Sequence, residues 1–199
     1  MINITNIVLR FIIFMLKMIK ENIILGIDPG TNIMGYGVIK KRKNKIDFLC
    51  LDVVLLNKIK NHNLKLKKIF EKTSELINNF SATEISIEAP FFGKNAQSML
   101  KLGRAQGAAM IAGIMHNIPI TEYAPKKIKM AITGNGRASK EQVAGMLTSM
   151  LSIHKKPKYL DATDGLAAAV CHALQQNNLN IDSKQSWSQF IKKNPDRIK

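Results

Sequence analysis

The chain has 199 residues, 46% of them apolar, which is enough for one domain with a substantial core and excludes a wholly disordered protein. Lys and Arg number 30 against 14 acids, and the formal net charge of +16 indicates a polyanionic partner, either nucleic acid or an anionic membrane surface. A competing explanation is drift in an AT-rich genome, because Lys, Ile and Asn are abundant throughout.

The positive charge is concentrated in two regions. Residues 40–72 carry 11 Lys and Arg against 3 acids, and residues 126–158 carry 8 against 1. The few remaining acids therefore lie in a positive field.

Residues 1–20 are apolar and basic, and their uncharged stretch at 11–16 is too short to span a bilayer. No cleavage site of a signal peptide is clear, and Met15 and Met18 offer alternative starts. We interpret the segment as an extension or a mis-called start, with an interfacial anchor as the alternative. A cytoplasmic protein without a membrane partner is expected.

From residue 21 onward the pattern is regular. Residues 23–28 form a short apolar run that predicts a buried strand, and Pro29 and Gly30 predict a turn. Residues 33–40 and 46–55 follow as second and third strands. Their hairpin spacing predicts antiparallel pairing.

The middle of the chain alternates helices and strands. Apolar residues on one face predict an amphipathic helix at about 63–79. We then expect a strand at 84–88, a Gly- and Ala-rich helix at 96–115 and a fifth strand at 118–123. Helical crossovers of this kind predict parallel additions to the sheet.

The C-terminal part is predicted to be helical. A short helix is expected near 125–132. Ser139 and Gln142 form a capping box that starts a helix ending near Leu151. A final helix is expected at about 159–176. The expected organisation is an extension at 1–20, one α/β domain at 21–176 with a mixed five-stranded sheet flanked by helices, and a polar tail at 177–199.

Four acids stand where a globular protein would not normally place them. Asp28 and Glu88 each end an apolar strand, while Asp161 and Asp164 share one face of the last helix. Clustered carboxylates persist only if they are protonated, paired or bound to a cation, and all-oxygen ligands favour Mg²⁺ or Mn²⁺. Two such ions can drive phosphodiester hydrolysis. Taken singly, Asp28 has the alternative of a turn former and Asp161 that of a helix cap.

Four sequence blocks resemble the motifs of the RuvC family of Holliday junction resolvases, the crossover junction endodeoxyribonucleases. They agree with the family in order and spacing, and the resemblance covers roughly residues 22–176. The blocks are Ile27-Asp28-Pro29-Gly30-Thr31-Asn32 with Gly35-Tyr36-Gly37-Val38; Ile87-Glu88-Ala89-Pro90-Phe91-Phe92 with Lys94-Asn95-Ala96; Leu102-Gly103-Arg104-Ala105-Gln106-Gly107; and Asp161-Ala162-Thr163-Asp164-Gly165-Leu166-Ala167.

The resemblance implies an RNase H-like fold and a homodimer that nicks a four-way DNA junction symmetrically during DNA recombination and repair. It assigns catalysis and metal binding, with two Mg²⁺ ions or Mn²⁺ in their place, to Asp28, Glu88, Asp161 and Asp164. It also implies the branch-migration complex RuvA–RuvB as a partner. The N-terminal extension and the polar tail depart from the family without touching a motif.

The resemblance also suggests roles for residues around the acids. Lys129 and Lys140 match basic positions that face DNA near the scissile phosphate, and Lys140 is included in the catalytic set. Phe91 is expected to stack on unpaired bases at the crossover, and Arg104 to contact DNA. The alternatives are a solvated surface for Lys140 and core packing for Phe91.

Two groups of glycines suggest close approach of another backbone. Gly35 and Gly37 alternate in a strand beside Asp28, and either DNA or a β-bulge would explain them. Gly103, Gly107 and Ala108 lie in the helix at 96–115, where they permit close packing. The resemblance suggests that part of this helix contacts a second subunit, and the alternative is packing on the protein's own sheet.

Three other functions are compatible with parts of the sequence. The segment at 26–31 also resembles the first phosphate motif of actin-like ATPases and sugar kinases, but 199 residues do not hold the two domains of those proteins. A non-catalytic junction-binding module would lack some of the acids, and all four are present. The third rival is the related YqgF-type RNA nuclease, which the substrate distinguishes.

Overall fold

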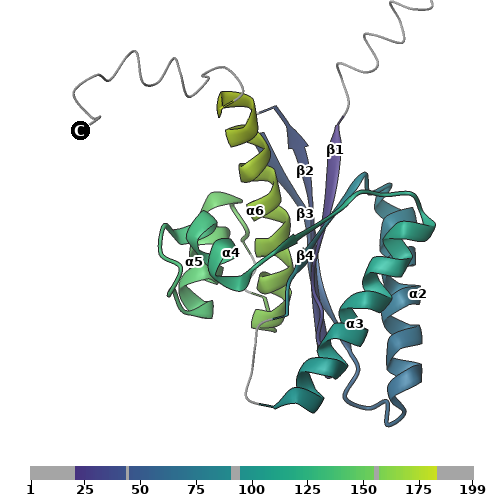
Figure 1. The fold of residues 1–199 in the computed structure, drawn as a ribbon. Coiled ribbons are helices and arrows are strands. Elements are labelled where there is room, and N and C mark those ends of the chain that lie inside the picture. The colour runs from purple at the N-terminus through teal and green to yellow at the C-terminus, as the bar shows by residue number, and fades with distance from the viewer. Residues whose placement is uncertain (1–20, 44, 91–94, 155–156, 183–199) are drawn as a thin grey trace, which may run out of the picture.

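A five-stranded mixed sheet forms the centre of the molecule (Figure 1). The computed structural model describes residues 21–43, 45–90, 95–154 and 157–182. The strand order is β3-β2-β1-β4-β5, with β1–β2 and β2–β3 antiparallel and β1–β4 and β4–β5 parallel, as expected. The strands are β1 (Asn22–Asp28), β2 (Ile33–Arg42), β3 (Lys45–Leu55), β4 (Glu84–Glu88) and β5 (Ile120–Tyr123).

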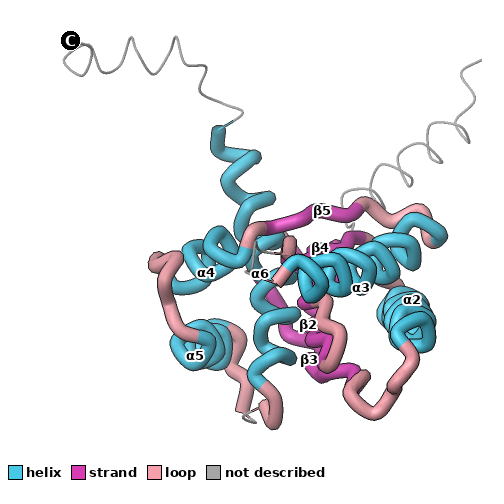
Figure 2. Tube along the Cα trace, turned by 60° about the horizontal axis from the view of Figure 1, so that its bottom comes forward, coloured by secondary structure: helices cyan, strands magenta, loops and turns pink. Residues whose placement is uncertain are grey.

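Helices cover both faces of the sheet (Figures 1 and 2). Alternate residues of a strand point to opposite faces, so Leu25 and Ile27 of β1 join one core cluster while Ile24 joins the other. The first cluster lies under α2 (His62–Phe80) and α3 (Ala96–Met115), and the second under α4 (Pro125–Thr133), α5 (Lys140–Met150) and α6 (Leu160–Asp182). The predicted RNase H-like α/β class is confirmed.

The predicted elements are all present, and most boundaries lie within two residues of the expected ones. β5 begins at Ile120 instead of residue 118, because Pro119 has no N–H with which to donate to the ladder. The expected end of the last helix at 176 is wrong: α6 continues to Asp182, since residues 177–182 contain neither Gly nor Pro to stop it. Within the described helices, none is long and apolar enough to cross a membrane.

The last helix lies unusually close to the sheet. A Cβ atom added to Gly35 would come 1.8 Å from the backbone oxygen of Asp161, and one added to Gly165 would come 2.5 Å from the Cα of Tyr36. The expectation that Gly35 and Gly37 admit DNA or form a bulge is therefore wrong. The neighbouring backbone is that of α6, and the register shift of β2 lies beyond both glycines, between Val38 and Ile39.

We expect Gly35→Ala to destabilise the protein by at least about 1–3 kcal/mol, because the methyl group must displace α6. The same displacement would move Asp161 and Asp164, which lie on the first turns of α6. Thermal unfolding measures the first effect. Gly145→Ala in α5 is the matched control: its added Cβ meets nothing within 4 Å, so it should stabilise by about 0.5–1 kcal/mol. Equal melting temperatures for the two variants would contradict the close-packing argument.

Buried hydrogen bonds fix α6 along its length. His172 Nδ1 lies 2.9 Å from the hydroxyl of Tyr123, and its Nε2 lies 2.5 Å from Oε2 of Glu84. Ser86 Oγ donates to the backbone oxygen of Ala168 at 2.7 Å. The hydrogen bond from His172 lowers the pKa of Glu84 despite partial burial. These contacts tie α6 to β4 and β5 and so set where its first turn lies.

Two glycines of α3 have no such close neighbour. Added Cβ atoms at Gly103 and Gly107 would meet nothing within 4 Å. Packing on the protein's own sheet is therefore wrong for these two glycines, whereas Ala108 packs partly against the core.

Candidate active site

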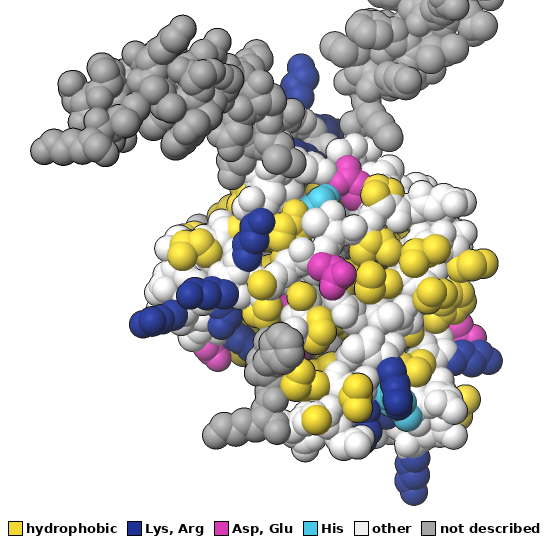
Figure 3. Space-filling model, in the orientation of Figure 1, with side chains coloured by type: hydrophobic (Ala, Val, Ile, Leu, Met, Phe, Trp, Pro, Cys, Tyr) yellow, Lys and Arg dark blue, Asp and Glu magenta, His cyan; other side chains and the backbone are white. Residues whose placement is uncertain are grey.

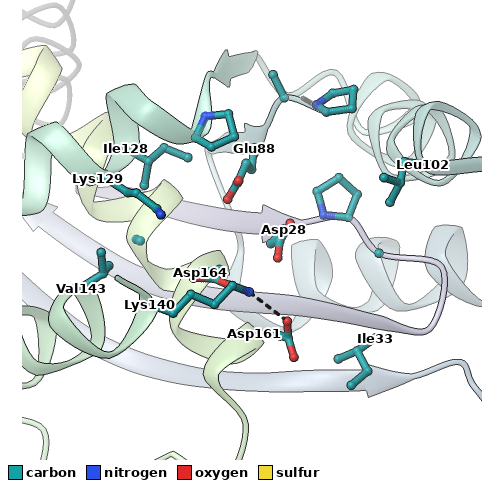
Figure 4. A pocket seen from close by; sticks show the side chains of 16 residues that line it. Asp28, Ile33, Glu88, Leu102, Ile128, Lys129, Lys140, Val143, Asp161 and Asp164 are labelled. Atoms are coloured by element: carbon teal, nitrogen blue, oxygen red, sulfur yellow. Dashed lines mark hydrogen bonds and ion pairs between the residues drawn. The ribbon is translucent and has the colours of Figure 1, made fainter. Parts of the chain in front are cut away.

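The four predicted acids meet in one cleft of about 320 Å³ (Figure 4). Asp28 ends β1 and Glu88 ends the parallel neighbour β4, where Ile27 pairs with Ile87. The carboxyl ends of parallel strands meet at one edge of a sheet, so these two side chains are brought together. Asp161 and Asp164, on the first turns of α6, reach the same cleft from the side.

Three of these acids are close enough to share one cation. Asp28, Asp161 and Asp164 each offer a carboxylate oxygen, and the three oxygens lie within 4.8 Å of one another. Glu88 is outside this group but lines the cleft, with its carboxylate directed toward the same space (Figure 4). An all-carboxylate set suits a hard divalent cation such as Mg²⁺ or Mn²⁺.

Burial raises the pKa of Asp28, Glu88 and Asp164 above the ordinary value of a carboxyl. Burial raises the pKa of Asp28 to about 7, and the charges of Asp164 and Asp161 add to this against the opposing charge of Lys140. Burial likewise raises the pKa of Glu88 to about 8, with a further contribution from Asp28. The pKa of Asp164 is also raised by burial, although its bond to Lys140 opposes the shift. The positive charge of the neighbouring lysines therefore does not fully offset the burial and repulsion of Asp28 and Glu88.

Lys140 is the basic residue nearest to the acids. It is the first residue of α5, directly after the Ser139–Gln142 capping box, which the structure confirms. Its Nζ lies 3.3 Å from Oδ1 of Asp161 and also bonds Asp164. Burial lowers the pKa of Lys140, but the carboxylates outweigh it and leave this pKa above its usual value. Lys140 thus keeps its charge at a helix start, where the macrodipole disfavours a cation.

We expect Lys140→Ala to slow single-turnover cutting of a junction by roughly 10²–10³-fold, the loss typical of one group that stabilises developing charge. Junction binding should weaken much less, because many other lysines remain. Lys140→Arg is the control, since it retains the positive charge and should restore part of the rate. If the alanine variant cuts at the parent rate, Lys140 belongs to the solvated surface.

The other predicted site residues differ in how the structure places them. Lys129 of α4 lines the cleft, and its charge acts to lower the pKa of Glu88 and of Asp164. Arg104 is exposed on α3 and is absent from the described cleft lining, to which that helix contributes Leu102 instead. Phe91 lies outside the described residues.

The sequence did not lead us to predict the apolar residues that line the cleft. Leu102 and Ile33 line it opposite the lysines (Figure 4). Leu102 opens the third motif block and Ile33 follows the first, so position within the motifs was the available signal. Such walls exclude water and strengthen the electrostatic interactions inside.

The sequence of the chain matches one protein family and several of its members. The family described as "Crossover junction endodeoxyribonuclease RuvC" matches residues 24–172. A protein of that name from Christiangramia forsetii is 62% identical over 90% of this chain and 94% of its own length. One from Bacteroides fragilis is 56% identical over 93% of this chain and all of its own length.

Solved structures of Holliday junction resolvases are also similar to this chain. The structure "T. thermophilus RuvC in complex with Holliday junction substrate" superposes with a TM-score of 0.73 at 28% identity, covering 79% of this chain and 96% of that one. The yeast mitochondrial Holliday junction resolvase Ydc2, at 14% identity and a TM-score of 0.54 over 81% of this chain and 84% of that one, shares the fold.

Proposed function

Because the chain belongs to the RuvC family of crossover junction endodeoxyribonucleases, we propose that it cuts four-way DNA junctions with Asp28, Glu88, Asp161 and Asp164. The chain is a nuclease of DNA recombination and repair that acts on Holliday junctions. The observation that carries the residue assignment is the convergence of four carboxylates from two strand ends and one helix in a single cleft.

The donor set fits the divalent metal dependence that this nuclease family implies. We assign Mg²⁺ as the ion, held by Asp28, Asp161 and Asp164, with Glu88 beside them, and Mn²⁺ as its substitute. When bound, such ions supply activation of a water molecule and stabilisation of the leaving oxygen. The raised pKa values of Asp28 and Glu88 support this, because near neutral pH added positive charge would favour the ionised form of each carboxyl.

The chain's own residues position the DNA. Lys129 and Lys140 offset the charge of the acids, so a phosphate can approach a site that would otherwise repel it. Leu102 and Ile33 limit the water around that phosphate. Stacking of Phe91 on bases at the crossover and DNA contact by Arg104 remain predictions, as does the partnership with RuvA–RuvB.

The decisive experiment compares three labelled substrates with Mg²⁺: a synthetic four-way junction, a linear duplex of the same sequence and a structured RNA. Paired nicks at symmetric positions of the junction, with little cutting of the other two, are expected. Preferential cutting of RNA would favour the YqgF-type alternative. Junction binding without cutting would favour a non-catalytic module.

We propose that the chain acts as a homodimer through the outer face of α3. Leu100, Ile111 and Ile114 are 56%, 50% and 56% exposed on that helix, and Gly103 and Gly107 lie between them with open space above. Small residues allow a second helix to approach closely, and a contiguous exposed apolar face indicates a protein interface. A two-fold dimer has two symmetry-related active sites, one for each of the two nicks in a junction.

Ile111→Glu is expected to convert the dimer to a monomer, because it places a charge in the centre of the apolar face. Sedimentation velocity measures the change. Met146→Glu on α5, at a residue 42% exposed, is the matched control and should leave the dimer intact. A dimer that persists in the Ile111 variant at the same concentration would place the interface elsewhere.

A further inference from the structure

The first of the two basic regions of the sequence contains a surface that the catalytic cleft does not use. Between Asp52 and Glu71 the chain has no acid and five lysines. These five, which we call the β3–α2 basic surface, run from the loop after β3 into the first turns of α2: Lys58, Lys60, Lys65, Lys67 and Lys68.

This surface lies at the same end of the sheet as the acids. Leu55 at the end of β3 pairs with Ile33, which lines the cleft. The backbone N–H of Leu56 donates to the backbone oxygen of Asn32 at 2.8 Å. Both the loop before α2 and the start of α6 lie at the lower end of the sheet in Figure 1, and Figure 2 shows that end from the front.

One lysine of the surface joins it directly to the catalytic loop. Lys65 Nζ donates to the backbone oxygen of Thr31 at 2.7 Å and to Oδ1 of Asn32 at 3.3 Å. The loop that carries these acceptors leaves Asp28 through Pro29 and Gly30, both of which line the cleft. The basic surface is thus continuous with the site.

The remaining lysines are poorly compensated within the protein. Lys58, Lys60, Lys67 and Lys68 are exposed. Lys67 has Glu71 at 3.6 Å, but in the described part of the chain no carboxylate forms an ion pair with Lys58 or Lys60. In Figure 3, Lys and Arg side chains gather over α4 and α5 and again at the lower right, near the start of α2. Uncompensated like charges at this density favour a polyanion.

We propose that the β3–α2 basic surface binds the phosphate backbone of a duplex arm of the junction where that arm leaves the catalytic cleft. Lys129 and Lys140 stand on the α4–α5 side of the acids and the β3–α2 basic surface on the other, so a strand that crosses the cleft meets lysines on both sides. The proposed contact is to phosphates, so it does not depend on the base sequence of the arm. The inference rests on the proposed junction-cutting function.

The test compares two double variants that remove the same charge. Lys58→Gln/Lys60→Gln alters the β3–α2 basic surface, and Lys43→Gln/Lys45→Gln alters the β2–β3 hairpin at the opposite end of the sheet. Junction binding is measured in chelator, so that no cutting occurs, over a range of salt concentrations. The slope of log K against log salt is negative, and each lost phosphate contact reduces its steepness by about 0.9. We expect a fall of about 2 for the first variant and little change for the second.

Two further measurements make the outcome decisive. Lys58→Arg/Lys60→Arg should restore the slope, because arginine keeps the positive charge. Lys43→Gln/Lys45→Gln should cut the junction at the parent's single-turnover rate, because the β2–β3 hairpin lies at the opposite end of the sheet from the acids. Equal slopes for the two glutamine variants would overturn the proposal. The preference of the parent protein for a junction over a linear duplex is measured in a separate assay. Absence of that preference would contradict the proposed function, whatever the slopes of the variants are.

Discussion

Glu88→Gln is expected to bind a four-way junction as well as the parent and to cut it at least roughly 10²–10³-fold more slowly, the scale on which single charge-stabilising groups act. The substitution keeps the shape of the side chain and removes one carboxyl from the cleft. Asp28→Asn and Asp161→Asn should behave in the same way, since all three side chains line the cleft. Binding rests instead on lysine–phosphate contacts, and the loss of a negative charge eases the approach of a phosphate.

The control for these variants is Glu75→Gln. Glu75 is an exposed acid of α2 that pairs with Lys72 at 2.7 Å, remote from the cleft lining. Its loss should change neither binding nor cutting. Single-turnover rates with a labelled junction and gel-shift titrations in chelator separate the two steps. A Glu88→Gln protein that cuts at the parent rate would remove Glu88 from the catalytic set.

The placement of the acids follows from rules that act along the chain. An apolar strand that ends in Asp28 and another that ends in Glu88 must bring these residues to one edge if the strands are parallel neighbours, and the i, i+3 spacing keeps Asp161 and Asp164 on one helix face. The capping box at Ser139 similarly fixed the start of α5 and with it the place of Lys140. Local pattern and sheet topology were therefore sufficient to predict the cluster.

The distance between α6 and the sheet depends on partners far apart in sequence. Gly35 and Gly165 signal a close approach, but neither residue indicates what approaches, and the expectation of DNA or a bulge failed for that reason. The bonds from Tyr123 through His172 to Glu84 join β5, α6 and β4, and no local pattern of one sequence specifies such a network. The exposed side of α3 was equally hidden, because small residues permit packing on either side of a helix.

Removal of divalent metal is expected to abolish cutting completely, and Mg²⁺ or Mn²⁺ should restore it. The reason is electrostatic as well as chemical. Without added positive charge, burial and repulsion keep Asp28 and Glu88 protonated until pH rises to about 7 and about 8 respectively. Chelator, followed by stepwise return of Mg²⁺ in excess, measures the effect on junction nicking. Full nicking in excess chelator would contradict metal dependence.

The same carboxyls should make the metal-free protein less stable as pH rises. A carboxyl whose pKa is raised on folding contributes stability that is fully present below its unfolded pKa, near 4.5 for Glu88, and that is lost as pH rises through about 8. In chelator, Glu88→Gln should therefore match the parent in melting temperature at about pH 5 and exceed it increasingly toward about pH 9. Mg²⁺ should raise the melting temperature of the parent more than that of the variant at the higher pH, because it compensates a charge that the variant lacks. A constant difference between the two proteins across this range would show that Glu88 titrates normally and that the cluster is less buried than its geometry indicates.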